Sequence, residues 1–294
     1  MSCSHRRFGA LTAGKYERED GLRVKKRDML DENRIKELLA LVGVSTRLVF
    51  FDRTDSTNDR AREWAKNAYT GECVAFLARE QTKGRGRRGR SFLSENGGIY
   101  LTILTVPNKN TGFERITAEA AVRVARVVEE LTGLSVGIKW VNDLYINGRK
   151  CAGILTEGEF DENGNLAYYA LGLGINVYKI DRFSSKIPIA TTLEDEIIGE
   201  NARGNAEASL PDINLLCARI IAALLSADTP GVSDYRERCI LLGKRVIIKR
   251  GDEQIFAVAL DILDDYSLLV ENERGERVVF NSGEVSTVFD TGSK

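Results

Sequence analysis

The sequence predicts an α+β protein in which a mixed, largely antiparallel sheet is flanked by helices and followed by a small C-terminal β-barrel. Three observations predict it. Strand-like runs joined by tight turns occupy residues 136–177, and tight turns join antiparallel strands. Amphipathic segments with helical spacing lie on both sides of this region and can cover a sheet. Five short strand-like runs separated by Gly, Asp and Asn follow Cys239, which is typical of a small barrel.

The first predicted elements are a helix, a strand and a second helix. The first helix takes Asp31 as its cap and carries its apolar residues on one face: Ile35, Leu38, Leu39 and Val42. A strand over residues 48–51 leads to the second helix, where Ser56 and Asp59 have the spacing of a capping box. A short polar segment therefore joins this strand to this helix.

The middle of the chain continues with strands and a long helix. Strands are predicted over residues 73–78 and 99–106, so the loop rich in Gly and Arg between them is internal. The long amphipathic helix ends near Gly133. The Asn-Gly pair at 147–148 is a strong type I′ hairpin signal, and another helix follows Pro211.

Length and changes of pattern divide the 294 residues into three parts. Residues 1–45 are expected to form a flexible extension with a short helix at its end, because the first 29 residues lack apolar periodicity. Residues 46–238 are expected to form the main, catalytic domain, and residues 239–294 the barrel.

Composition argues against several classes of protein. The formal net charge of -1 gives no overall attraction to nucleic acid or anionic membrane. We find neither a signal peptide nor a run of about 20 apolar residues that could span a membrane. The five cysteines contain no Cys-x-x-Cys pair, so a reducing, cytoplasmic location is expected; they are Cys3, Cys73, Cys151, Cys217 and Cys239.

The single histidine, His5, lies in the polar N-terminal segment. Its position argues against Ser-His-Asp and Cys-His nucleophile systems and against histidine metal sites. Lysine, arginine, carboxylates and backbone groups are left to carry any reaction.

The loop 83–90 contains five cations and three glycines without one acid. Glycine permits close approach of the backbone to a ligand, and Arg binds phosphate or carboxylate through two hydrogen bonds. We expect the loop to be mobile until an anionic ligand orders it. A solvated basic loop or a nucleic-acid contact are the alternatives, but the internal position and the single nearby aromatic residue, Phe92, favour a small anion.

Two further segments carry candidate chemistry. Lys150 follows the hairpin turn, where it is either an exposed cation or a point charge that stabilises negative oxygen. The pair Gly172 and Gly174 superficially resembles a dinucleotide-binding fingerprint. Because Val177 replaces the third glycine and no helix follows, these glycines are more plausibly sites of close approach by a flat ligand or another backbone.

Five motifs, in this order and at this spacing, resemble those of the biotin protein ligase family. They are Ser56-Thr57-Asn58, Gln81 with Gly84 to Arg90, Lys139-Trp140-Val141-Asn142-Asp143, Arg149-Lys150-Cys151-Ala152-Gly153-Ile154, and Gly172-Leu173-Gly174-Ile175-Asn176-Val177. The resemblance covers about residues 48–290 and includes Ala190 to Leu193 and Gly283 to Ser286. Val141 stands where the family usually has proline.

The resemblance implies a fold like that of class II synthetases with an SH3-like barrel, and a two-step reaction. Biotin and Mg·ATP form biotinyl-5′-AMP, and a lysine of a biotin carboxyl carrier protein then takes the biotinyl group. ATP and biotin are thus substrates, with Mg²⁺. The family often dimerises through sheet edges, so a homodimer is compatible with the resemblance. The first 46 residues appear too short for a winged helix, so no sequence-specific nucleic acid binding is expected, and no membrane partner.

The resemblance also assigns residues, with Lys150 and Arg87 as the catalytic pair. Biotin is expected to contact Ser56, Thr57, Asn58, Gln81, Arg85, Gly86, Arg87, Lys150 and Gly153. ATP is expected to contact Arg85, Arg87, Arg90, Phe92, Lys139, Asn142, Lys150 and Asn176. The metal ligands are not identified. A lipoate or octanoate ligase is the nearest alternative, and a nucleic-acid-binding module that uses the Gly/Arg loop is the alternative from another class.

Overall fold

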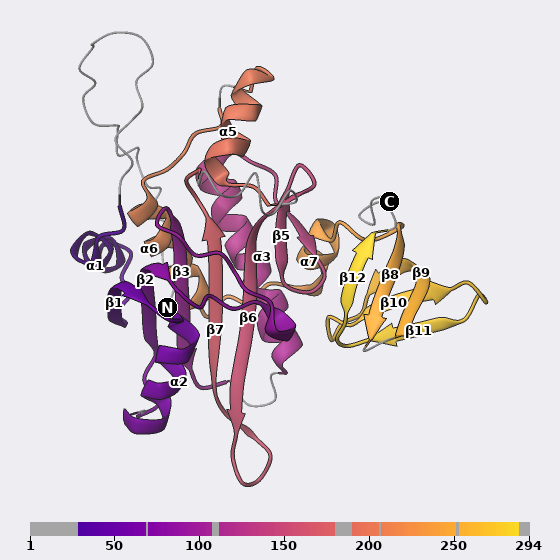
Figure 1. The fold of residues 1–294 in the computed structure, drawn as a ribbon, viewed down its shortest axis with the longest axis horizontal. Coiled ribbons are helices and arrows are strands. Elements are labelled where there is room, and N and C mark those ends of the chain that lie inside the picture. The colour runs from indigo at the N-terminus through magenta and orange to yellow at the C-terminus, as the bar shows by residue number, and fades with distance from the viewer. Residues whose placement is uncertain are drawn as a thin grey trace, which may run out of the picture.

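The computed structural model describes residues 29–68, 70–107, 112–179, 190–205, 207–250 and 253–287. Most of the predicted N-terminal extension lies outside these residues. Figure 1 shows a large sheet with helices packed on it and a smaller sheet at one side of the molecule. No helix within the described ranges is both long enough and apolar enough to cross a bilayer.

The large sheet has seven strands in the order β1-β2-β3-β7-β6-β5-β4. Only β1 and β2 pair in parallel, and the other neighbours are antiparallel, so the predicted mixed, largely antiparallel sheet is confirmed. The strands are β1 (Arg47–Thr54), β2 (Val74–Gln81), β3 (Gly98–Thr105), β4 (Gly137–Lys139), β5 (Asp143–Ile146), β6 (Arg149–Phe160) and β7 (Leu166–Asn176). The hairpin of β6 and β7 is the longest and projects beyond the other strands (Figure 1).

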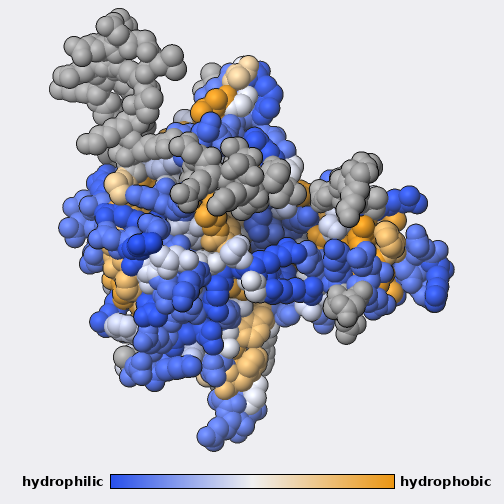
Figure 2. Space-filling view, in the orientation of Figure 1, coloured by the Kyte–Doolittle hydropathy of each residue, from blue (hydrophilic) through white to orange (hydrophobic). Residues whose placement is uncertain are grey.

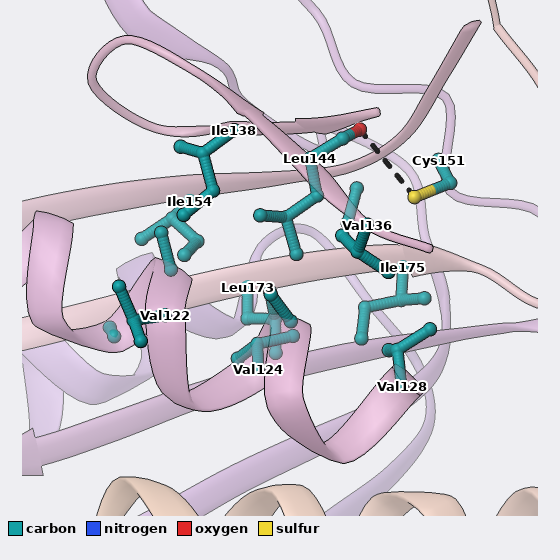
Figure 3. Packing of buried hydrophobic residues seen from close by; sticks show 14 of the residues in the cluster. Val122, Val124, Val128, Val136, Ile138, Leu144, Cys151, Ile154, Leu173 and Ile175 are labelled. Carbon is teal, nitrogen blue, oxygen red and sulfur yellow. Dashed lines mark hydrogen bonds between the residues drawn. The ribbon is translucent and has the colours of Figure 1, made fainter. Parts of the chain in front are cut away.

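Helices cover both faces of this sheet because successive strand residues point to opposite sides. Ala75 and Leu77 of β2 belong to the main core under α3, whereas Val74 and Phe76 pack with Ala61 of α2. Figure 3 shows valines of α3 against residues of β4, β6 and β7. The helices are α1 (Glu32–Leu41), α2 (Thr57–Ala68), α3 (Phe113–Thr132), α5 (Leu193–Ala202), α6 (Ile213–Leu224) and α7 (Val232–Arg238), with a single 3-10 turn at η1 (Arg87–Gly89).

The smaller sheet has five antiparallel strands in the order β11-β10-β9-β8-β12. They are β8 (Arg245–Arg250), β9 (Glu253–Ile262), β10 (Leu268–Asn272), β11 (Arg277–Phe280) and β12 (Glu284–Thr287). Buried Trp140 donates its indole N–H to the carbonyl of Tyr266 at 2.9 Å, and Ile240 N–H bonds to the carbonyl of Ile138 at 2.9 Å. These bonds fix the smaller sheet beside β4.

The sequence predicted an N-terminal cap for each of the first two helices, and the two predictions have different outcomes. Asp31 caps α1 by accepting from Arg34 N at 2.8 Å, as predicted. The predicted capping box forms only in part: Ser56 Oγ accepts from Asp59 N–H at 3.5 Å, but Ser56 N–H donates to Asp55 Oδ1 at 2.7 Å rather than to Asp59. The carboxylate of Asp59 pairs with Arg85. Two helices, α5 and α7, were not predicted.

The outer surface in the orientation of Figure 2 is mainly hydrophilic, with apolar residues visible along the projecting β6–β7 hairpin. Phe160 near the end of β6 is 57% exposed and packs edge-on against Phe113, with ring centroids 5.6 Å apart. This contact ties the hairpin to the start of α3.

Candidate active site

A cavity of about 350 Å³ opens between the large sheet, the Gly/Arg loop and β12 of the smaller sheet. All but one of the predicted site residues line it. These are Ser56, Thr57, Asn58, Gln81, Arg85, Gly86, Arg87, Arg90, Phe92, Lys139, Asn142, Lys150 and Gly153. The fold therefore brings four separate motifs together at a single place.

One end of the cavity is a buried network of hydroxyl and amide groups. Thr57 donates to Gln81 Oε1 through both its backbone N–H, at 2.8 Å, and its hydroxyl, at 3.1 Å. The hydroxyl of Thr102 on β3 lies 2.8 Å from Thr57 Oγ1 and 2.6 Å from Asn58 Oδ1. Ser56 is 2% exposed. Among the described residues its hydroxyl oxygen accepts only one long contact, of 3.5 Å, from Asp59 N–H. The network holds these polar groups in fixed orientations and leaves the Ser56 hydroxyl available.

Two carboxylates that sequence reasoning missed bind Arg85 at this end. Its Nη2 lies 2.8 Å from Asp59 Oδ1 and 2.8 Å from Glu157 Oε2. The same Glu157 oxygen accepts from Asn58 Nδ2 at 2.8 Å. Glu157 follows Gly153 on the same face of β6, four residues on, so the period of two in that strand could have identified it.

A second cluster, of two cations, an amide and a carboxylate, lies at the predicted catalytic position. Lys150 Nζ is 2.7 Å from Asp143 Oδ1, which also accepts from Asn142 Nδ2 at 2.9 Å. Arg87 Nη1 donates to Asn142 Oδ1 at 3.0 Å. Burial lowers the pKa of the Arg87 guanidinium, because removal from water disfavours its charged form. Even so, an arginine starts far above neutral pH and stays charged.

The strand glycines make room for protein side chains, which corrects the expectation of a flat ligand or a second backbone. A Cβ on Gly172 would overlap Asn58 Oδ1, and one on Gly174 would lie 2.5 Å from the ring of Phe92. On β6, Gly153 lies beside Lys150, whose Nζ would be 3.2 Å from a Cβ. Glycine at these three positions lets the side chains of the cavity sit against the sheet.

The Gly/Arg loop is attached to both sheets. Arg88 Nη1 donates to the carbonyl of Lys249 at 3.2 Å, and Arg90 forms an ion pair with Glu284 of β12. Within the loop, Gly86 N–H donates to the carbonyl of Arg90 at 2.7 Å. Ordering of this loop by a ligand stays a prediction.

Asn176 is not among the described residues that line the cavity. It is 3% exposed, and its Nδ2 donates to the carbonyl of Thr191 at 3.1 Å. Its Oδ1 is buried and has no hydrogen-bond partner among the described residues. Contact between Asn176 and a nucleotide therefore stays a prediction.

The described ranges contain neither a cysteine with a lowered thiol pKa nor a cluster of metal-ligating side chains. The cysteines there are free, and burial raises the pKa of the Cys151 thiol to about 12, so the neighbour of Lys150 is no nucleophile at neutral pH. No group of three histidine, cysteine or acidic side chains suited to a metal ion occurs in that part of the chain. Cations and hydrogen-bond donors line the described site.

Comparison with known proteins decides the family. Residues 50–176 match the model of the biotin/lipoate A/B protein ligase family, and residues 241–288 match the biotin protein ligase C terminal domain. The biotin--[acetyl-CoA-carboxylase] ligase of Paracoccus denitrificans is 30% identical over 237 residues, which cover 77% of this chain and 95% of that protein. The chain belongs to the biotin protein ligase family.

Other biotin protein ligases agree in sequence and in structure. The biotin--[acetyl-CoA-carboxylase] ligase of Mycobacterium tuberculosis is 29% identical over 275 residues, covering 88% of this chain and 96% of that protein. The biotin protein ligase of Aquifex aeolicus, solved in complex with biotin and ATP, superposes with a TM-score of 0.64 at 28% identity. The match covers 83% of this chain and 99% of that one. The predicted family and fold are confirmed, and the roles of single residues stay predictions.

Proposed function

We propose that this biotin protein ligase joins biotin to ATP in the cavity and passes the biotinyl group to a lysine of a biotin carboxyl carrier protein. In the first step a biotin carboxylate oxygen attacks the α-phosphorus, and the bond to pyrophosphate breaks. In the second the lysine amine attacks the acyl carbon, AMP leaves and the amine loses a proton. The proposal rests on one observation: an end lined by the neutral side chains of Ser56, Thr57, Asn58 and Gln81 and a cationic end share one cavity.

The neutral end suits the ureido ring of biotin, which carries one carbonyl and two N–H groups. Ser56 and Gln81 offer a hydroxyl and an amide there, and Thr57 holds the Gln81 amide in place. Gly153 keeps that side of the cavity open. Because Arg85 faces two carboxylates, we assign it with Gly86 to the biotin end, where it anchors the loop.

The cationic end suits the phosphates. A carboxylate and a triphosphate repel each other, and positioned charges that match the developing charge lower that barrier. Lys150 and Arg87 supply these charges, and Asp143 orients Lys150 through their 2.7 Å contact. We place Arg90, Phe92, Lys139 and Asn142 along the nucleotide, with Asn176 beyond them.

Mg²⁺ arrives with ATP and supplies further neutralisation of phosphate charge. It usually keeps several waters and needs only one or two carboxylates besides the phosphates. Asp143 fits this demand, because both of its contacts with Lys150 and Asn142 use Oδ1 and leave Oδ2 for the ion.

Several wider assignments belong to the same proposal. We divide the chain into residues 1–45, 46–238 and 239–294, and we place it in the cytoplasm, where free thiols such as Cys73 persist. A homodimer would pair the eight-residue edge strand β1, since the opposite edge strand, β4, has only three residues and lies against the smaller sheet.

Biotin-dependent exchange of labelled pyrophosphate into ATP tests the function. We expect exchange with biotin and Mg²⁺, and none when lipoate or octanoate replaces biotin. Exchange with lipoate alone would reassign the substrate. No exchange with any of these acids, together with tight and salt-dependent binding of nucleic acid to the loop, would favour the nucleic-acid module.

A further inference from the structure

We propose that Glu196 is a positioning residue that ties the hairpin carrying Lys150 to the segment that holds Asn176. Glu196 lies in α5, and its side chain is only 1% exposed. A carboxylate this buried is costly unless it is paired and hydrogen-bonded, so its partners identify what it stabilises. This role rests on the proposed function, because Lys150 and Asn176 are assigned to the nucleotide there.

Side chains from two segments meet at this carboxylate. Glu196 Oε1 lies 2.7 Å from Arg149 Nη2 and accepts from Thr191 Oγ1 at 2.7 Å. Its Oε2 accepts from Asn147 Nδ2 at 2.9 Å. Asn147 lies in the turn before Lys150 and Arg149 begins β6, whereas Thr191 precedes α5. The carboxylate therefore holds the turn and that segment together.

Thr191 in turn connects the two residues assigned to the nucleotide. Its N–H donates to the carbonyl of Lys150 at 2.8 Å, and its carbonyl accepts from Asn176 Nδ2 at 3.1 Å. Thr191 is 2% exposed, so water does not readily replace these bonds. Since Nδ2 is engaged, Thr191 also fixes the direction of the unpaired Asn176 Oδ1. Displacing Thr191 disturbs both residues at once.

The buried network at the biotin end shares no member with this connection. Thr57 bonds to Gln81, Thr102 links Thr57 to Asn58, and Asn58 bonds to Glu157. No contact between these residues and Glu196 occurs in the described ranges. Loss of Glu196 is therefore expected to affect ATP and to spare biotin.

Glu196→Gln tests this role, because it keeps the shape and places an amide N–H against a donor. We expect the KM for ATP to rise about tenfold, as loss of one buried bond to a charged group predicts. The KM for biotin, and biotin binding measured by calorimetry without ATP, should stay within about twofold. Steady-state pyrophosphate exchange gives both KM values, and circular dichroism confirms the fold.

Two more variants separate this role from general damage. Thr191→Val removes only the hydroxyl and should raise the KM for ATP in the same way, and the double variant should be little worse than Glu196→Gln alone. Glu200→Gln is the control, because Glu200 lies one turn further on α5 and bonds to Asn147 at 3.2 Å but not to Thr191. It should behave as wild type.

The outcomes against the proposal are distinct. Suppose that the wild type is active. If Glu196→Gln and Thr191→Val leave the KM for ATP unchanged, or raise the KM values for ATP and biotin equally, the role of Glu196 alone is overturned. A wild type without biotin-dependent exchange overturns the proposed function and this role with it.

Discussion

Lys150 and Arg87 are both cations, but their partners differ. Lys150 pairs with the carboxylate of Asp143, whereas Arg87 bonds to the neutral amide of Asn142. The first pair is neutral overall and the second keeps its positive charge. We therefore propose that Arg87 attracts the anionic substrates, and that Lys150 is the charge that Asp143 holds at a set position for the transition state.

Lys150→Ala should lower the rate of adenylation far more than the affinity for biotin. Loss of one preorganised donor to developing negative charge commonly costs about 10²–10³ in kcat, and we expect a loss of that order. Pyrophosphate exchange measures the rate, and calorimetry measures biotin binding. Lys83→Ala is the control, since Lys83 is an exposed cation at the start of the same loop and does not line the cavity. A wild-type rate for Lys150→Ala would contradict the assignment.

Glu157→Gln should raise the KM for biotin about tenfold and leave the KM for ATP nearly unchanged. The reason is that the neutral amide loses the charge that pairs with Arg85 at Oε2 and turns an N–H toward Arg62, which lies 3.8 Å from Oε1. Glu159→Gln is the matched control, because Glu159 lies two residues on along the same strand and is exposed. If only the KM for ATP changed, Glu157 would act at the nucleotide end of the cavity, and its assignment to the biotin end would be contradicted.

At the scale of elements, the sequence patterns were most informative where structure depends on near neighbours. The type I′ turn at Asn147-Gly148 and the left-handed end of α3 at Gly133 are both confirmed, because each is set by a few adjacent residues. The helix α5 was missed, although Thr192 caps it by accepting from Asp195 N at 3.1 Å and acids fill its first turn. Those signals are local, and they could have predicted it.

Contacts that depend on tertiary register were not predictable in this way. Asp59, Arg85 and Glu157 come from a helix, a loop and a strand, and nothing in their own neighbourhoods states that they meet. The motif resemblance placed Asn58 in the cavity. The alternation of side chains along β7 did not predict that Asn58 would fill the space left by Gly172. The sequence therefore predicted which residues line the cavity, but not which of their side chains pair.

Gly172→Ala tests that packing at the level of the strand. Its Cβ would lie 2.9 Å from Asn58 Nδ2 and closer still to Oδ1, and Asn58 is held by Glu157 and Thr102. We expect a loss of about 1–3 kcal/mol in the free energy of unfolding, as for other overpacked sites, with weaker biotin binding. Gly199→Ala in α5 is the control, because its nearest neighbour would be 3.8 Å away and alanine favours a helix. Equal stability of the two variants would contradict this packing.

At the scale of the whole molecule, the smaller sheet completes the cavity. Gly283 to Ser286 line one side of it, next to the loop arginines. Because Arg88 and Arg90 contact the smaller sheet and Arg85 contacts the larger one, the loop spans both. The two sheets therefore enclose one cavity.

The ion pair of Arg90 and Glu284 makes part of this connection dependent on pH. The hydrogen bond from Arg90 holds the pKa of Glu284 below its ordinary value of 4.5. The folded state then binds fewer protons than the unfolded state, so the pair stabilises the fold above about pH 4.5 and is lost as the pH falls through the lowered pKa. Arg90 is 66% exposed, so water and salt screen the pair, and about 0.2–1 kcal/mol is expected.

Glu284→Gln should therefore unfold more easily than wild type near neutral pH by that amount, and the two proteins should converge as the pH falls through the lowered pKa of Glu284. Urea unfolding at several pH values measures the difference, and added salt should shrink it because the pair is exposed. Glu273→Gln, at an exposed acid in the turn between β10 and β11, is the control for loss of one negative charge. A difference that persists undiminished in acid would mean that Glu284 stabilises the protein by packing, and the connection between the loop and the smaller sheet would then rest on the Arg88 bond to Lys249.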